Sequence, residues 1–403
     1  MDFLEITIER NPALIRSAVE LYREGKISAN TVVVDLDVVE RNARIIAEAA
    51  RKHGLRLYFM TKQFGRNPEM CNVIRKAGIE SAVAVDLEDA QCLIRNGIPV
   101  GHVGHLVQVP KNDVGYVLEH VRPEVITVFN AEKALHVHEE AKKRGTTQKI
   151  LLRVVGQGDF FYPNQFGGIW EEEVEKVVSE ICRLDSLKIT GVTSFPCFRF
   201  NMRTKKVEAL PNLTTLLRVA EKLRRMGIEV EQINAPGDNA ASTMELAAQS
   251  GATHVEPGHA FTGTTPWHAF EDLPEAPAWI YVTEVAHVDG DRAYTLGGGL
   301  MSGDAPLGVW SHLYHVHRLS ALVGGSSDTI LERKVSAIPA GYIDYYGELR
   351  LPRGLDVKVG DIAVYGLRNQ VFVSRARVAI VRGIQSGTPE VIGIFNREGR
   401  AVG

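Results

Sequence analysis

The stretch LRLYFMTKQFGRNPEMCNVIRKAGIESAVAVD, residues 55–86, contains the unit on which the fold prediction rests. Two short apolar runs, 55–61 and 81–86, enclose a helix-like segment from Glu69 to Ala77. Short apolar runs that alternate with amphipathic helices are typical of parallel strands joined by helical crossovers. The stretch therefore predicts a β-α-β unit.

The same unit repeats along the first two thirds of the chain. After 55–61 and 81–86, further strand-like runs lie at 100–105, 124–129, 149–155, 188–195, 229–237 and 253–258. Eight such units fit the roughly 250 residues of a (β/α)8 TIM-type barrel. An open doubly wound sheet is the alternative, but the usual Gly-rich dinucleotide motif is missing after the first strand.

The pattern of strands alternating with helices ends after Thr265. PWHAFEDLPEAPA, residues 266–278, is rich in proline and acidic residues, and the chain beyond it has mostly β-rich runs such as FVSRARVAIV. We predict an α/β barrel over residues 31–272, preceded by an N-terminal extension over 1–30. A smaller all-β C-terminal domain is expected over 273–403.

Composition narrows the classes of partner and compartment. The formal net charge is −3, with 46 Lys and Arg against 49 Asp and Glu, so no basic excess favours nucleic acid or an anionic membrane. The four cysteines show no metal-ligand spacing, and the His-x-x-His-x-His pattern at 312–317 has no nearby cysteine. No signal peptide or long apolar run is evident. We expect a cytoplasmic protein without a metal site.

Lys62 follows directly on the first strand of the series, where a barrel of this kind collects its reactive groups. Partial desolvation of its ammonium group would lower its pKa toward that of a usable nucleophile. A solvated loop lysine is the alternative.

Two more strand ends carry candidate binding residues. NAPGDNAAS, residues 234–242, ends the seventh strand with small residues that would allow close approach of a phosphate, or simply form a turn and cap. VEPGHAFTGT, residues 255–264, ends the eighth strand and places Glu256 where a carboxylate needs a cation or a hydrogen-bond donor. A solvent-facing glutamate is the alternative.

The β-rich part contains AIPAGYIDYYG, residues 337–347, in which Tyr342 and Asp344 lie close together. Such aromatic residues usually form core or interface, but a tyrosine can also act as a general acid or base. Arg66, Arg199 and Arg203 are candidates for binding a carboxylate, since guanidinium binds that group in bidentate fashion.

Taken together, these motifs resemble the alanine-racemase-like, fold-type III pyridoxal-phosphate (PLP) enzymes, and within them the YhfX-like subgroup. The similar segments are VVVDLDVVERNARI (32–45), YFMTKQFG (58–65), DNAAS (238–242), VEPGHAFTG (255–263) and PAGYIDYYG (339–347). The resemblance implies PLP as cofactor, with Lys62 as its lysine and Tyr342 as the second catalytic base. It also implies a set of cofactor-binding residues: Gly237, Asn239, Ser242, Glu256, Gly258, His259, Thr262 and Gly263.

Several positions depart from the family pattern. Racemases have an arginine facing the pyridine nitrogen, and this chain has Glu256 at that position. In this respect it is similar to the EPGR motif of the ornithine-decarboxylase branch. His259, however, replaces the phosphate-binding arginine of the EPGR motif. Phe64 replaces a phosphate-binding tyrosine, and Gln165 lies roughly where an arginine helps hold substrate. These departures put strict alanine specificity in doubt.

The resemblance implies an amino-acid racemase or epimerase with Lys62 and Tyr342 as opposed acid/bases. Tyr342, with Asp344 nearby, would reach the cofactor of the partner subunit in a homodimer with shared active sites. A decarboxylase, or a lyase acting on a D-amino or β-hydroxy amino acid, remains an alternative because of Glu256. A non-catalytic PLP carrier is a further alternative, although such carriers lack both the β domain and Tyr342.

Overall fold

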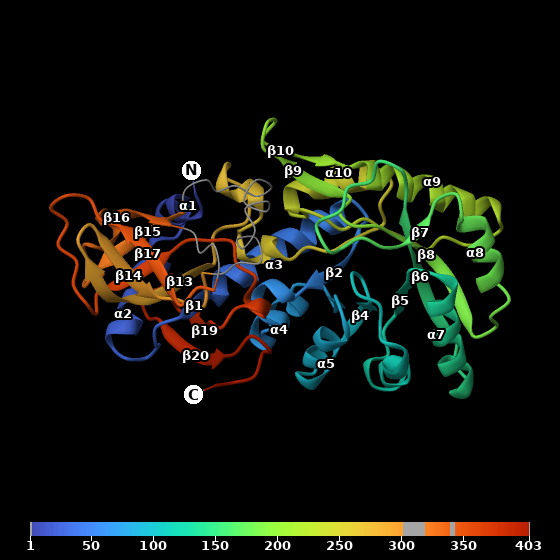
Figure 1. Cartoon of the computed structure of the whole chain (residues 1–403), viewed down its shortest axis with the longest axis horizontal. Helices are drawn as coiled ribbons and strands as arrows, with labels where there is room; N and C mark the ends of the chain where they lie inside the picture. The colour runs from blue at the N-terminus through green and yellow to red at the C-terminus, as the bar shows by residue number, and fades with distance from the viewer. Residues whose placement is uncertain (1, 301–318, 339–342, 403) are drawn as a thin grey trace. The chain divides into compact units, whose positions relative to one another are not determined.

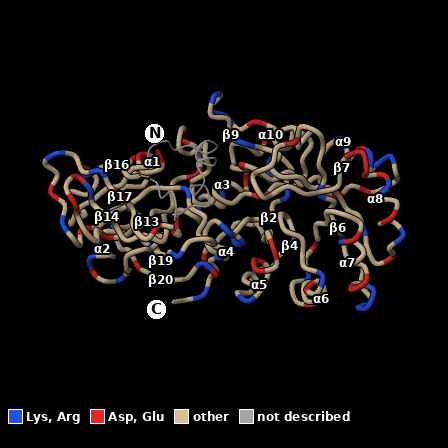
Figure 2. Tube along the Cα trace, in the orientation of Figure 1, with Lys and Arg blue, Asp and Glu red and all other residues tan. Residues whose placement is uncertain are grey.

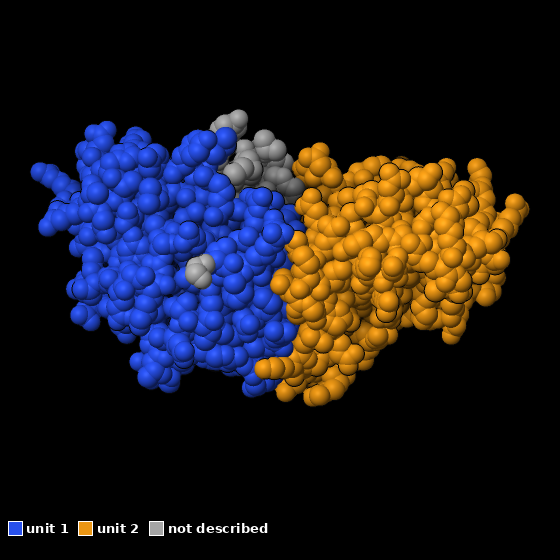
Figure 3. All heavy atoms as spheres, turned by 90° about the horizontal axis from the view of Figure 1, so that it is seen from below, with its two compact units in different colours: residues 1–45, 62–73, 259–403 blue, residues 46–61, 74–258 orange. Residues whose placement is uncertain are grey.

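The computed structural model describes residues 2–300, 319–338 and 343–402. The chain divides into two compact units, coloured separately in Figure 3. Unit 1 comprises residues 1–45, 62–73 and 259–403, and unit 2 comprises residues 46–61 and 74–258.

Unit 2 contains a closed barrel of eight parallel strands (Figure 1). The strands are β2 (Arg56–Met60), β3 (Ser81–Ala84), β4 (Val100–Val103), β5 (Val125–Val128), β6 (Gln148–Val155), β8 (Leu187–Thr193), β11 (Gln232–Asn234) and β12 (His254–Val255). Each pairs in parallel with the next, and β12 pairs with β2 to close the ring. The predicted TIM-type barrel is confirmed, and its strands correspond to the eight runs identified in the sequence.

The barrel strands form because β-branched and apolar residues can be buried on both faces of a parallel sheet. β4 and β5 are buried throughout, and β3 is buried except at its first residue. Helices separate most of the strands, and Figure 1 shows α7, α8 and α9 on the outer side of β6 and β8. These helices are α4 (Pro68–Lys76), α5 (Leu87–Arg95), α7 (Ala131–Lys143), α8 (Val174–Ile181), α9 (Pro211–Arg225) and α10 (Met244–Gln249).

Two irregular connections lie at the carboxyl ends of the barrel strands. The loop after β6 carries the aromatic residues of GDFFYPNQFGG and ends in β7 (Ile169–Trp170), which pairs with β6. After β8 the chain forms an antiparallel hairpin of β9 (Phe198–Asn201) and β10 (Lys206–Ala209) before α9 begins.

Unit 1 contains a nine-stranded sheet in the order β14-β17-β16-β15-β18-β13-β1-β19-β20. Its strands are β1 (Thr31–Asp35), β13 (Trp279–Asp289), β14 (Arg292–Leu296), β15 (Leu319–Gly324), β16 (Lys334–Ile338), β17 (Tyr346–Arg350), β18 (Ile362–Tyr365), β19 (Arg377–Arg382) and β20 (Glu390–Phe395). Except for the β1–β19 pair, the strands run antiparallel, and β14 also pairs with β13. The all-β C-terminal domain is therefore present as predicted.

β1, which the sequence places just before the barrel series, is a strand of this sheet. It pairs antiparallel with β13 and parallel with β19, and all five of its residues are buried. α3 (Leu36–Lys52) follows it directly.

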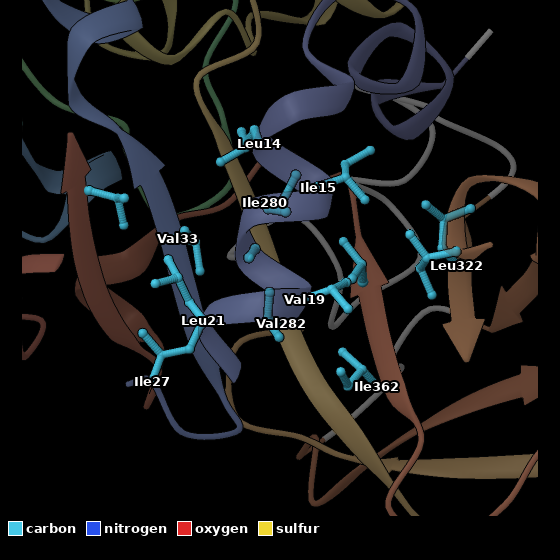
Figure 4. Close-up of a cluster of buried hydrophobic side chains, with 14 of the residues drawn as sticks. Leu14, Ile15, Val19, Leu21, Ile27, Val33, Ile280, Val282, Leu322 and Ile362 are labelled. Carbon is cyan, nitrogen blue, oxygen red and sulfur yellow. The ribbon is translucent and has the colours of Figure 1, made fainter. Parts of the chain in front are cut away.

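Residues 2–30 contain two helices, α1 (Phe3–Arg10) and α2 (Pro12–Arg23). Asp2 and Glu5 form a capping box at the start of α1, and Pro12 opens α2 at a position where it costs no hydrogen bond. α2 packs Leu14, Ile15 and Val19 against the sheet residues Ile280 and Ile362 (Figure 4). The N-terminal extension is therefore part of the core of unit 1.

Acidic and basic residues are interspersed along the trace of both units, as Figure 2 shows. Among the described helices, none combines the length and the apolar character that crossing a membrane requires.

Candidate active site

Glu256, the residue after β12, is the centre of a buried polar cluster in unit 2. Its side chain is inaccessible to solvent. Oε1 lies 2.7 Å from Nδ1 of His102 and accepts a 2.7 Å hydrogen bond from Nδ2 of Asn234, the last residue of β11. Oε2 lies 3.3 Å from Nδ1 of His105. The eighth-strand glutamate therefore lies inside the barrel end, contrary to the solvent-facing alternative.

His102 has hydrogen-bond partners at both of its ring nitrogens. Its Nε2 lies 2.5 Å from Oγ1 of Thr127 on β5, while Nδ1 meets Glu256. This arrangement fixes the orientation of the imidazole ring, because a histidine held at both nitrogens cannot rotate without breaking a bond. Thr127, His102 and Glu256 thus form one hydrogen-bonded chain across the barrel interior.

The cluster keeps the Glu256 carboxyl group ionised. Complete burial by itself would raise its pKa, but the positive charges that His105 and His102 can carry lower it, as do hydrogen bonds from His102 and Asn234. The balance brings the pKa of Glu256 down from 4.5 to about 2. A buried, ionised carboxylate is suited to a cationic or N–H-bearing ligand.

The same donor set has the chemistry of a metal site. One ligand atom from each of His102, His105 and Glu256 lies within 4.8 Å of the others. The histidine spacing in the sequence did not lead us to expect such a group. However, both nitrogens of His102 are already engaged, so hydrogen bonding accounts for this residue without an ion.

The turn after β11 contains three predicted cofactor residues. Asn239 is buried and its Oδ1 accepts hydrogen bonds from the backbone N–H groups of Gly237 and Glu256, at 3.0 and 3.3 Å. Gly237 pairs with Phe198, and a Cβ there would lie 2.3 Å from the carbonyl oxygen of Phe198. Ser242 lies in the 3-10 turn Ala241–Thr243 and is exposed. Gly237 is thus required for close packing of the turn on β9.

Arg153 of β6 organises the loops around the cluster. Its guanidinium donates hydrogen bonds of 2.8–2.9 Å to the carbonyl oxygens of His105, Gln165 and Gly167. Phe195, after β8, lies against the ring of His105, with 5.3 Å between the ring centroids. Gln165, expected from the sequence near the substrate, therefore contributes its backbone carbonyl to an internal bond with Arg153.

In unit 1, Lys62 opens the 3-10 turn η1 (Lys62–Phe64), two residues after the end of β2. It is half-buried, and Phe64 is completely buried. Arg66 is also buried and donates a 3.2 Å hydrogen bond to the carbonyl oxygen of Arg397. Lys62 is therefore not the fully solvated loop lysine that was the alternative.

His259 opens the 3-10 turn η5 (His259–Thr262) in the same unit. Burial lowers its pKa well below the usual value, and the positive charges of Arg368, Lys62 and His268 lower it further. His259 is therefore neutral near pH 7 and does not replace the charge of an arginine. Its Nε2 lies 3.5 Å from Nε2 of Gln370.

The remaining predicted residues of this segment are buried or serve in the turn. Thr262 is buried and shares a 2.7 Å hydrogen bond with Thr264, and Gly258 is buried at the end of the unit 2 segment. Gly263 has a φ of +63°, and a Cβ there would lie 2.3 Å from the carbonyl oxygen of Ala276.

Tyr342 lies outside the described residues, as does the histidine pattern at 312–317. Asp344 is described and buried. Its Oδ2 accepts hydrogen bonds from the N–H groups of Gly298 and Leu300 at 2.7 and 2.9 Å, and its Oδ1 lies 3.2 Å from Arg375. Asp344 therefore anchors the 298–300 turn in unit 1.

His102, His105 and Asn234 were not identified from the sequence. Each lies at the carboxyl end of a barrel strand or directly after it, in VGHVGH and in EVEQINAPG. The position rule that selected Lys62 and Glu256 applies equally to these three residues. The signal was present, but only closure of the barrel shows that all three side chains meet Glu256.

Comparison with known proteins identifies the family. Residues 34–266 match the alanine racemase N-terminal domain, and residues 280–391 match the YhfX-like C-terminal domain. The chain is 37% identical to the uncharacterized protein YhfX of Escherichia coli K12 over 402 residues, covering all of both chains. It is 24% identical over 217 residues to the lysine racemase of Thermotoga maritima, covering 53% of this chain and 56% of that one.

Among solved structures, the D-threonine aldolase of Filomicrobium marinum matches with a TM-score of 0.65 at 15% identity, covering 93% of this chain and 96% of that one. At this identity the likeness concerns the fold. The match over more than half of the chain and the full-length relative lead to one conclusion: the chain belongs to the alanine racemase-like family and carries a YhfX-like C-terminal domain.

Proposed function

We propose that the protein is a PLP-dependent enzyme that acts at the Cα of an amino acid, as a racemase or epimerase. The observation that carries the proposal is the buried, ionised Glu256 held by His102, His105 and Asn234. Lys62 follows β2 by two residues, and β2 is the barrel neighbour of β12, which Glu256 follows directly. The alanine racemase family fold typically binds PLP.

The residues present fit this cofactor. Oε2 of Glu256 is buried and accepts no hydrogen bond from the described residues, although His105 lies nearby. An ionised carboxylate oxygen in this state is an acceptor suited to the N–H of a pyridinium ring. Nδ2 of Asn239 is likewise buried without an acceptor among the described residues. These two atoms could accept from and donate to a polar ligand.

When bound, PLP withdraws electrons from the Cα of an amino acid joined to it. In the proposed reaction Lys62 would hold the cofactor through its amine and would also take or return a proton at Cα. Glu256 would accept a hydrogen bond from the pyridine N–H, while His102 and Asn234 hold the carboxylate in its orientation. The ring of Phe195 lies against that of His105, beside the carboxylate.

Tyr342 is the proposed second acid/base, acting on the opposite face of Cα from Lys62. Two opposed groups allow a proton to leave one face and return to the other, which is racemisation. The relationship to alanine and lysine racemases in the family supports this choice. The second candidate is a lyase, favoured by Glu256 in place of the racemase arginine and by the fold shared with D-threonine aldolase. Glu256 in place of the racemase arginine also leaves decarboxylation as a candidate reaction.

A substrate panel separates these activities. Purified protein with PLP is incubated with each L- and D-amino acid and with β-hydroxy amino acids, and chirality, CO2, aldehyde and keto acid are followed together. The proposal expects inversion at Cα without release of CO2, aldehyde or keto acid. Cleavage products without inversion would establish the lyase or decarboxylase instead. PLP binding without any turnover across the panel would favour the non-catalytic carrier.

A further inference from the structure

Arg199 on β9 lies beside the turn that follows β11. The backbone from Cys197 to Phe200 runs along residues 236–238: Cys197 N–H donates to the carbonyl of Pro236 at 2.8 Å, and Asp238 N–H donates to that of Phe198 at 3.1 Å. The N–H of Phe200 donates to Oδ2 of Asp238 at 2.9 Å. Arg199 is therefore placed at the carboxyl end of the barrel by a rigid backbone.

Arg199 is half-buried, and one of its donors lacks an acceptor among the described residues. It lies over the ring of Phe160, 4.7 Å from the centroid, and its Nε is buried without a hydrogen-bond partner among the described residues. Glu208, opposite Arg199 in the β10 register, instead accepts hydrogen bonds from Asn201 and Thr204. The carboxylate of Asp238 lies near enough to interact electrostatically with the guanidinium. A buried guanidinium N–H without an acceptor is costly, and an anionic ligand would supply the missing acceptor.

Phe160 is itself held in place. Its N–H donates to Oδ1 of Asn212 at 2.9 Å, and Nδ2 of Asn212 donates to its carbonyl oxygen at 3.0 Å. These bonds fix the backbone of Phe160, whose ring lies beneath the guanidinium of Arg199. Such preorganisation reduces the entropy lost when the arginine binds a ligand.

The turn beside Arg199 supplies few backbone donors of its own. The N–H groups of Gly237, Asp238, Asn239 and Ala240 all donate hydrogen bonds within the turn or to β9. Asn239 contributes a second buried donor without an acceptor, its Nδ2. An anion at this turn would thus rely on side-chain donors, and Arg199 and Asn239 come from the two segments that pair at Phe198 and Gly237.

We propose that Arg199 binds the phosphate group of PLP at the Gly237 turn, with Nδ2 of Asn239 as a second donor. The assignment rests on the proposed function for the identity of the ligand. A guanidinium gives a dianionic phosphate two parallel hydrogen bonds and a full charge, which lysine does not reproduce.

The test compares two ligands that differ only in the phosphate. Dissociation constants of PLP and of pyridoxal are measured by absorbance for the wild-type protein, Arg199→Gln and Arg199→Lys. Arg225→Gln is the control, because Arg225 is an exposed arginine of the same unit paired with Glu221. We expect Arg199→Gln to weaken PLP by about 10- to 100-fold and pyridoxal by less than about twofold. Arg199→Lys should be intermediate, and the control unchanged for both ligands.

Two results would overturn the assignment. Equal weakening of PLP and pyridoxal would mean that Arg199 only supports the fold of the hairpin. Unchanged PLP affinity with a raised KM for the amino acid would assign Arg199 to the substrate carboxylate.

If the wild-type protein binds no PLP, the proposed function fails, and inorganic phosphate decides the fate of the anion site. If wild-type protein broadens the phosphorus resonance of inorganic phosphate and Arg199→Gln does not, the anion site at Arg199 is supported. If neither protein broadens the resonance, Arg199 forms no anion site.

Discussion

At the scale of single residues, Glu256 has an environment that only specific partners make tolerable for a charge. It is a fully buried carboxylate whose charge is maintained only by His102, His105 and Asn234. Glu256→Gln keeps the shape but loses the charge. Turnover should fall about 10²–10³-fold, as for other groups that stabilise charge in a transition state. The control is Glu231→Gln, a carboxylate at the other end of the barrel paired with Lys149 and Lys188. Unchanged kcat in a folded Glu256→Gln protein would show that this carboxylate does not act on the cofactor.

The lowered pKa of Glu256 also makes a prediction for stability. Because the pKa is about 2 when folded and 4.5 in the reference state, Glu256 adds to the free energy of unfolding above about pH 4.5. That contribution is lost as the pH falls toward about 2. Urea unfolding at a series of pH values should therefore show wild-type protein losing more stability than Glu256→Gln across this range. Parallel pH dependences for the two proteins would contradict the assigned environment.

At the scale of the elements, the turn at Gly263 is determined by its backbone. Alanine at position 263 would have to adopt a left-handed backbone conformation. Its Cβ would also lie 2.3 Å from the carbonyl oxygen of Ala276. Gly227 also has a positive φ, of +81°, but a Cβ there would meet no atom within 4 Å. Gly227→Ala should cost about 1–2 kcal/mol through conformation alone. Gly263→Ala should cost about 1–3 kcal/mol more through overpacking. Equal losses in urea unfolding would refute the close contact.

The elements also show what the sequence can predict. All eight barrel strands were recognisable because a parallel strand buried on both faces is a continuous apolar run between helices. The sheet to which β1 belongs could not be recognised from the sequence, because its run TVVVD fits a buried strand of either sheet. Only its pairing with β13 and β19 assigns it to the sheet of unit 1. The site divides in the same way. Lys62 and Glu256 stand out by position, and Arg199 is recognisable as a candidate for binding an anion, whereas the contact of His102 with Glu256 depends on closure of the barrel.

At the scale of the whole molecule, we expect the proposed site to be completed by a second subunit. A barrel end open to water would expose the reacting Cα to stray protons, and we expect a homodimer in which Tyr342 reaches the cofactor of the partner subunit. Inactive Lys62→Ala and inactive Tyr342→Phe proteins are mixed and allowed to exchange subunits. About a quarter of wild-type activity should return, because half of the dimers are mixed and each rebuilds one site of two. No recovery after verified exchange would place Tyr342 in its own subunit's site or outside any site.

The central claim is that Lys62 is the residue that holds PLP. The most direct measurement is reduction of the PLP-loaded protein with borohydride, followed by a peptide map of the modified lysine, with Lys62→Arg as control. The account predicts a single reduced adduct on Lys62, in the peptide that contains YFMTKQFG, and no adduct in the control. An adduct on another lysine, or none in protein that is folded and saturated with PLP, would contradict it.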